Sequence, residues 1–176
     1  MTRQTIGLAL FLALVCSANG FAQGRTTVDP YTTNLGVRYD FFSHSGDANS
    51  FVGFNADVTR MLGGFTNGGG WGAGGGVEFE KFDSATLKEF EGYVTAQAVA
   101  IGKKQMSPFG RFGIGINTDE GFTDMLIDFR GGVDFKWKPD ANYLISVMAS
   151  VKRVLADVQG FTVFRLSAGV VIPLAK

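Results

Sequence analysis

The sequence contains one cysteine, Cys16, and one histidine, His44, among 176 residues. A lone cysteine cannot form an intramolecular disulfide, and a lone histidine without a partner thiol does not make a zinc site of the usual kind. The 16 basic residues are balanced by 16 acidic residues, so the chain has no basic field to attract nucleic acid. We therefore expect no metal, no cofactor and no nucleic-acid partner.

Long apolar runs are also missing. The run at residues 6–15 is too short to span a bilayer as a helix, and it follows Arg3 and precedes Gly20, Phe21 and Ala22. This layout is typical of a secretory signal, so we assign residues 1–22 to a signal peptide and residues 23–176 to one domain. Beyond residue 22 no stretch approaches the roughly 18 apolar residues of a membrane helix. A membrane location would therefore require a closed β-barrel, which also satisfies every backbone group in lipid.

Apolar residues alternate with polar or small ones from Tyr31 to the C-terminus, the period of a β-strand. Eight segments show this pattern, and each is long enough to cross a bilayer as a tilted strand. They are residues 31–42, 51–61, 71–82, 90–101, 108–116, 124–137, 142–154 and 162–174. Polar or proline-containing turns separate several of them, at 43–50, 117–121, 138–140 and 157–160.

Small residues lie on the polar face of these segments, where they suit a narrow lumen better than a solvated surface. They include Gly72, Gly74, Gly76, Gly113, Gly115, Ser150 and Ser167. Alternation alone does not decide whether the apolar face contacts lipid or a core, so a soluble periplasmic carrier barrel remains an alternative.

Aromatic residues mark both ends of the apolar face. With the mature N-terminus in the periplasm, the aromatics near the periplasmic turns are Trp71, Phe109, Trp137 and Tyr143, and those near the outer loops are Phe41, Phe51, Phe79 and Phe161. Two aromatic girdles are typical of transmembrane barrels. The sequence therefore predicts an all-β protein, an eight-stranded antiparallel up-and-down β-barrel in the bacterial outer membrane.

The polar face collects charges of both signs. Six are positive (Arg38, Arg111, Arg130, Lys136, Lys152 and Arg165) and seven are negative (Asp40, Asp57, Glu78, Glu80, Asp124, Asp128 and Asp134). Charges in a narrow interior are tolerated when they are paired and hydrogen-bonded. We therefore predict a salt-bridged plug rather than a selectivity filter.

The stretches 54–60, 131–136 and 164–171 resemble strands of the small eight-stranded outer-membrane β-barrel family. The resemblance implies an outer-membrane location, insertion by the barrel-assembly machinery, contact with outer-membrane lipid and lipopolysaccharide, and a monomer. Members commonly end on an aromatic residue that the insertion machinery reads, whereas this chain ends on Leu174, Ala175 and Lys176. The motifs are structural and imply little about function.

One set of residues would support catalysis. His44, Asp83 and Ser84 are expected at the outer end of the barrel, and together they look like the His, Asp and Ser of the outer-membrane lipid A palmitoyltransferase. A histidine that takes a proton from a serine hydroxyl suits acyl transfer, but the chain lacks the amphipathic helix that precedes the first strand of that enzyme. We therefore predict a non-catalytic protein with a structural, envelope-stabilising or surface-interaction role. A lipid A acyltransferase and a small pore are further alternatives.

Overall fold

The computed structural model describes residues 32–45, 48–49, 52–65, 69–81, 86–98, 105–119, 122–138, 140–155 and 160–174. The segment assigned to a signal peptide, residues 1–22, lies outside these ranges. Within them, no helix has the length and apolar character that crossing a membrane requires.

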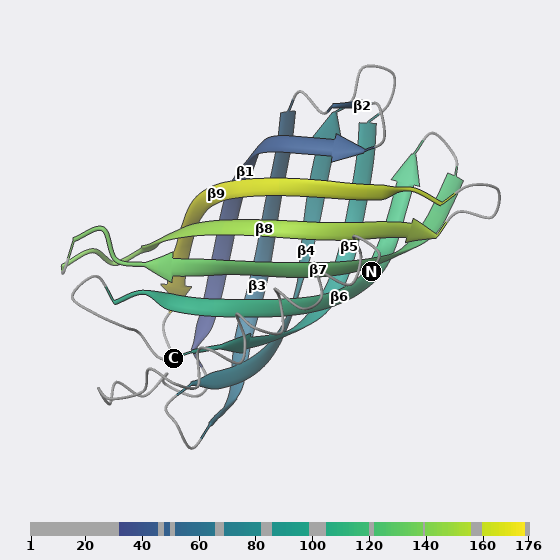
Figure 1. The fold of residues 1–176 in the computed structure, drawn as a ribbon. Coiled ribbons are helices and arrows are strands. Elements are labelled where there is room, and N and C mark those ends of the chain that lie inside the picture. The colour runs from purple at the N-terminus through teal and green to yellow at the C-terminus, as the bar shows by residue number, and fades with distance from the viewer. Residues whose placement is uncertain are drawn as a thin grey trace, which may run out of the picture.

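Eight long antiparallel strands form the described fold, and a two-residue strand adds to one of them. They are β1 (Thr33–Ser45), β3 (Val52–Gly64), β4 (Gly70–Lys81), β5 (Thr86–Gln97), β6 (Ser107–Asp119), β7 (Phe122–Phe135), β8 (Leu144–Leu155) and β9 (Thr162–Leu174), with β2 (Ala48–Asn49) beside the end of β1. Each long strand pairs with the next, and β1 also pairs with β9, which closes the sheet (Figure 1). The predicted eight-stranded up-and-down barrel is confirmed.

Strand β5 begins and ends earlier than the sequence pattern suggested, since it spans Thr86–Gln97 rather than residues 90–101. Strands β4 and β5 pair along their whole lengths, with Gly70 opposite Gln97 at one end. Because β4 begins at Gly70, the partner strand ends there too. In the sequence, the apolar residues at 98–101 continue the pattern of the strand, so the pattern does not indicate that β5 ends at Gln97.

Apolar side chains cover the outside of the barrel, and the inside holds mainly charged and polar side chains, with a few apolar ones such as Leu126, Met148 and Val163. On β7, Phe129 is 41% exposed, whereas Asp128 and Arg130 on either side of it are 0% and 5% exposed. The same arrangement recurs around the wall, where the exposed apolar residues include Tyr39, Phe54, Val58, Phe90, Val94, Ile114, Val147, Val151 and Phe164. A soluble carrier barrel needs an apolar interior, so that alternative does not fit the described residues.

A β-bulge in β1 turns two successive phenylalanines outward. The pairing of β1 with β9 shifts between Asp40 and Phe42, and Phe41 and Phe42 are 55% and 45% exposed. A bulge adds one residue to one strand and so exchanges the two faces beyond it. Ser43 consequently faces the interior and is buried.

Glycines in the wall make room for large interior side chains. A Cβ atom on Gly113 would overlap the Glu91 carboxylate, and a Cβ atom on Gly74 would lie 2.6 Å from Cζ of Tyr93. An eight-stranded barrel is about wide enough for side chains to fill it. Glycine in one strand thus permits a long side chain from the neighbouring strand to lie across it.

Candidate functional site: the ion-paired interior

Thirteen buried charged side chains fill the barrel, and we refer to them as the interior network. Five are basic (Arg38, Arg111, Arg130, Lys152 and Arg165) and eight are acidic (Asp40, Asp57, Glu78, Glu80, Glu89, Glu91, Asp128 and Asp134). None is more than 9% exposed. Because removing a charge from water is costly unless it is paired, the contacts among these residues determine whether the interior is stable.

Asp57 on β3 is the centre of one part of the network. Its Oδ2 atom accepts hydrogen bonds from Nη1 of Arg38 and from Nη1 of Arg111, the latter at 3.0 Å. Its Oδ1 atom accepts a hydrogen bond of 2.9 Å from the Tyr93 hydroxyl. Thr59 lies beside this group, with 2.5 Å between its hydroxyl oxygen and that of Tyr93. One carboxylate thus joins side chains from β1, β5 and β6.

Arg111 is also held by two aromatic rings. Its guanidinium carbon lies 4.7 Å from the centre of the Tyr93 ring and 4.9 Å from the centre of the Phe109 ring. These are cation–π distances. Phe109 is only 7% exposed, so its predicted place in the periplasmic aromatic girdle is wrong. The reason is the period of two, since Phe109 and Arg111 are two residues apart on β6 and must share a face.

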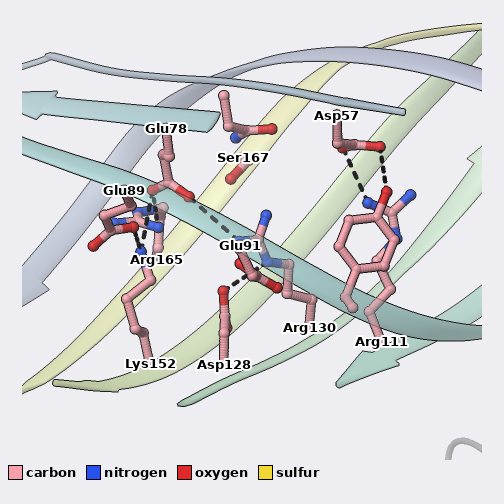
Figure 2. Close-up of polar contacts among 12 residues, drawn as sticks. Asp57, Glu78, Glu89, Glu91, Arg111, Asp128, Arg130, Lys152, Arg165 and Ser167 are labelled. Atoms are coloured by element: carbon pink, nitrogen blue, oxygen red, sulfur yellow. Dashed lines mark hydrogen bonds and ion pairs between the residues drawn. The ribbon is translucent and has the colours of Figure 1, made fainter. Parts of the chain in front are cut away.

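Glu78 on β4 is the centre of the other part of the network (Figure 2). Its Oε2 atom lies 3.5 Å from Nη2 of Arg130, and its Oε1 atom lies 3.4 Å from Nζ of Lys152. The Oε1 atom also pairs with Nη1 of Arg165. The three cations come from β7, β8 and β9, so a single carboxylate on β4 links three strands of the far wall.

Each of these three cations has at least one further carboxylate partner. Arg130 donates from Nε to Asp128 at 2.6 Å and from Nη2 to Glu91. The remaining pairs are Lys152 with Glu89, and Arg165 with Glu80 and with Asp40. The cations of this part are therefore shared among several acids rather than held in isolated pairs.

Several contacts cross the lumen rather than run along the wall. Three strands separate β4 from β8 in either direction around the barrel, so the contact between Glu78 and Lys152 joins opposite sides. The pair formed by Asp57 on β3 and Arg111 on β6 also crosses the interior. In Figure 2 the labelled side chains extend from different strands toward one another in this way.

The space left within the network is small. A cavity of about 10 Å³ is lined by residues that include Asp57, Glu78, Tyr93 and Arg130. This is about the space that one water molecule requires. Among the described residues, the network therefore fills the lumen at this level.

The structure places most of the predicted lumen residues in this network. The interior holds Arg38, Asp40, Asp57, Glu78, Glu80, Arg111, Asp128, Arg130, Asp134, Lys152 and Arg165. Asp134 accepts a hydrogen bond of 3.2 Å from Nε2 of Gln97. Lys136, directly after β7, and Asp124, on β7, are half-buried instead.

Sequence reasoning missed Glu89, Glu91 and Tyr93. All three lie on β5 at alternate positions and are buried. The segment assigned to this strand began at residue 90, so Glu89 fell outside it. Glu91, Tyr93, Thr95 and Gln97 nevertheless alternate with smaller or apolar residues in the sequence, a signal that could have identified the polar face of β5.

The remaining predicted interface aromatics lie mostly on the outside of the barrel. Trp71, Trp137, Tyr143, Phe41 and Phe79 are between 41% and 64% exposed. Phe161 is half-buried, and Phe51 lies outside the described residues.

Of the three residues of the catalytic alternative, the structure describes His44 alone. His44 lies on β1, opposite Phe164 of β9, and is exposed. Asp83 and Ser84 lie outside the described residues. Among the described residues there is also no group of three or more His, Cys, Asp or Glu side chains placed to hold a metal ion.

Comparison with known proteins supports the fold. No family model and no curated protein matches the sequence. The crystal structure of Neisserial surface protein A (NspA) matches with a TM-score of 0.55 and 14% identity, over 81% of this chain and 97% of that chain. The outer membrane protein Ail of Yersinia pestis, in a phospholipid bilayer nanodisc, matches with a TM-score of 0.45 and 17% identity, over 82% of this chain and 99% of that chain. The expected resemblance to small eight-stranded outer-membrane β-barrels is confirmed at the level of fold.

Proposed function

We propose that this chain is an integral protein of the bacterial outer membrane with a structural, envelope-stabilising or surface-interaction role. The observation that carries this proposal is the inversion of the barrel, with apolar side chains outside and thirteen charged side chains buried inside. An apolar outer wall is compatible with a lipid environment. A closed barrel also leaves no unpaired sheet edge exposed to that lipid.

The closed interior supports a structural role over that of a pore. Glu78 of β4 binds cations from β7, β8 and β9, so the opposite walls are tied together. A pore of this size would need small neutral residues at every level to keep a continuous water path. NspA, which shares this fold, is by its name a surface protein, and this agrees with a role at the cell surface.

Extraction of membranes at alkaline pH tests the location. We expect the mature chain to stay with the membrane pellet, and to migrate faster on a gel unheated than heated because a closed barrel resists detergent. Recovery in the soluble periplasmic fraction, with no mobility difference, would contradict the proposal.

A further inference from the structure

Glu91 and Asp128 share one cation in the interior network, and we refer to these two residues as the acid pair. Nη2 of Arg130 pairs with Oε2 of Glu91, and Nε of Arg130 donates to Oδ2 of Asp128 at 2.6 Å. Figure 2 shows both side chains directed toward Arg130. Among the described residues, neither member of the acid pair has another ion-pair partner. Two negative charges thus meet one positive charge, which also lies 3.5 Å from Glu78.

The two carboxyl groups of the acid pair are also in contact with each other. They lie within hydrogen-bond distance. In the described part of the chain, Oε1 of Glu91 and Oδ1 of Asp128 have no hydrogen-bond donor. Ionised carboxylates are acceptors only, so a hydrogen bond between two of them requires a proton on one. Like charges at such a short separation do not both stay ionised in a buried site.

Glycines in β6 permit this contact. Strand β6 lies between β5 and β7, and it carries Gly115 opposite Glu91 and Gly113 opposite Asp128. A Cβ atom on Gly113 would overlap the Glu91 carboxylate. The Glu91 side chain therefore reaches across β6 toward Asp128 because two inner positions of β6 have no side chain.

The part of the network around Glu78 has more negative than positive charge. Its three cations meet six carboxylates within ion-pair distance. The cations are Arg130, Lys152 and Arg165, and the acids are Asp40, Glu78, Glu80, Glu89, Glu91 and Asp128. The acid pair therefore lies where positive charge is already shared among several acids.

The groups that face the acid pair do not supply a second positive charge. Asp57 on β3, Glu78 on β4, and Glu89 and Tyr93 on β5 line the same small cavity as Glu91. Lys152 lies opposite Asp128 on β8 but pairs with Glu78 and Glu89. The nearest cation of β6, Arg111, pairs with Asp57, and Arg165 of β9 pairs with Asp40, Glu78 and Glu80.

Apolar side chains close this part of the interior toward one end of the barrel. The next inner residues beyond Asp128, Lys152 and Arg165 are Leu126, Val154 and Val163, and each of them is 0% exposed. Water therefore does not surround the acid pair. An unbalanced negative charge in such a place is costly.

We propose that the acid pair is a proton-binding site, in which Glu91 and Asp128 share one proton at neutral pH. One O–H bond forms on one carboxyl group with a proton taken from water, and the other carboxylate accepts the hydrogen bond. The acid pair then has one negative charge, which Arg130 balances. A proton fits better than a metal ion, because the cavity beside Glu91 measures about 10 Å³ and is also lined by Arg130.

Proton binding by the acid pair makes the stability of the barrel depend on pH. Free Asp and Glu side chains lose their protons near about pH 4, so the unfolded chain holds no proton at these positions at neutral pH. The folded chain then binds one proton more than the unfolded chain, and a rise in pH favours unfolding. Each such proton makes the unfolding equilibrium constant rise about tenfold per pH unit.

Urea unfolding in lipid vesicles, from about pH 5.5 to about pH 7.5, tests the proposal. The unfolding constant of the wild-type protein should rise by at least about tenfold per pH unit. Glu91→Gln gives Asp128 a permanent hydrogen-bond donor in place of the proton, so the rise should be about tenfold smaller per pH unit. The matched control is Asp140→Asn, an amide substitution in an exposed turn, which should keep the wild-type pH dependence.

Nuclear magnetic resonance of the folded wild-type protein in detergent micelles locates the proton without any variant. The carboxyl carbon signals of Glu91 and Asp128 should shift together above neutral pH, because a shared proton belongs to the pair. The exposed Asp140 is the internal control and should titrate near about pH 4.

Three results would overturn the proposal. The first is that both carboxyl carbons keep the signal of an ionised group down to about pH 5.5. The second is that Glu91→Gln retains the full pH dependence of the wild-type protein. The third is that stability depends on the sodium or potassium concentration in place of pH, because a metal ion would then balance the acid pair. None of these results bears on the outer-membrane location, which membrane extraction tests separately.

Discussion

At the scale of single residues, Glu78 holds an exceptional position because three cations share its carboxylate. Arg130, Lys152 and Arg165 all lie within ion-pair distance of it. Each of them also has another acidic partner, so the loss of Glu78 weakens several contacts without stranding any one cation entirely. The carboxylate therefore acts as a cross-link between strands.

We expect Glu78→Gln to lower the thermal unfolding temperature in detergent. Removing one partner from a buried ion pair costs roughly 3 to 5 kcal/mol, and here the loss is spread over three cations. The matched control is Asp140→Asn, which neutralises an exposed carboxylate in a turn and should change stability by less than about 0.5 kcal/mol. Equal midpoints for the two variants would show that the interior network does not stabilise the barrel.

Arg111 offers a second test at this scale, because its guanidinium makes two kinds of contact. It pairs with Asp57 and stacks on the rings of Tyr93 and Phe109. Lysine keeps the charge but loses the planar group that stacks. We expect Arg111→Lys to destabilise the barrel by about 1 kcal/mol and Arg111→Ala by about 3 kcal/mol, measured by urea unfolding in lipid vesicles. Indistinguishable losses in the two variants would mean that stacking and charge cannot be separated at this site.

At the scale of the strand, the period of two decides which residues meet lipid. Phe129 and Met125 lie on the same outward face of β7, at different distances from its end. Phe129→Arg should hinder insertion by about 2 to 4 kcal/mol because it lies nearer the bilayer midplane, and Met125→Arg by about 0 to 1 kcal/mol because it lies nearer the interface. Folding yields into vesicles measure this difference. Equal yields would show that Phe129 and Met125 do not lie at different depths in the bilayer.

The same period explains how far the sequence predicts this fold. The alternation in β7 and β9 identified both faces because polar, charged or small residues occupy most inner positions and apolar residues occupy most outer positions. It failed for β5, where an apolar run beyond Gln97 disguises the strand end, and for Phe109, an aromatic residue on the polar face. Residue type alone does not indicate whether an aromatic residue faces lipid or the interior when, like Phe109, its ring stacks on a buried cation.

The partners within the interior depend on register, which residue patterns do not reveal. Glu78 meets Lys152 because β4 and β8 lie opposite each other in a closed barrel, and their residues are 74 positions apart in sequence. A shift of one residue in any pairing would turn a strand's charges toward lipid. The set of lumen residues was therefore largely predictable, whereas the two centres, Asp57 and Glu78, emerge only from the three-dimensional arrangement.

At the scale of the whole molecule, the interior is more acidic than the sequence suggested. Five basic and eight acidic residues are buried, whereas six and seven were expected. Glu89 and Glu91 are buried acidic residues that were not expected. Asp124 and Lys136 were expected in the interior but are half-buried. The charged strand residues whose side chains are described as exposed, Arg60, Lys81, Lys88 and Arg153, are all basic. Any ion path through this interior would favour cations, because acidic linings attract them.

The closed interior predicts that the folded wild-type protein shows no steady conductance in planar bilayers. Contacts from Glu78 to Lys152 and from Asp57 to Arg111 cross the lumen, and the cavity beside them measures about 10 Å³. A hydrated ion needs a continuous water path, and moving the paired side chains aside would leave buried charges without partners. The recording should use protein whose folding is verified by the heat-shifted mobility, with heated protein as the control. Reproducible conductance steps that are cation-selective and occur only with the folded sample would contradict a closed lumen. Cation selectivity is the expected signature because any path through this lumen would be lined by an excess of acidic groups.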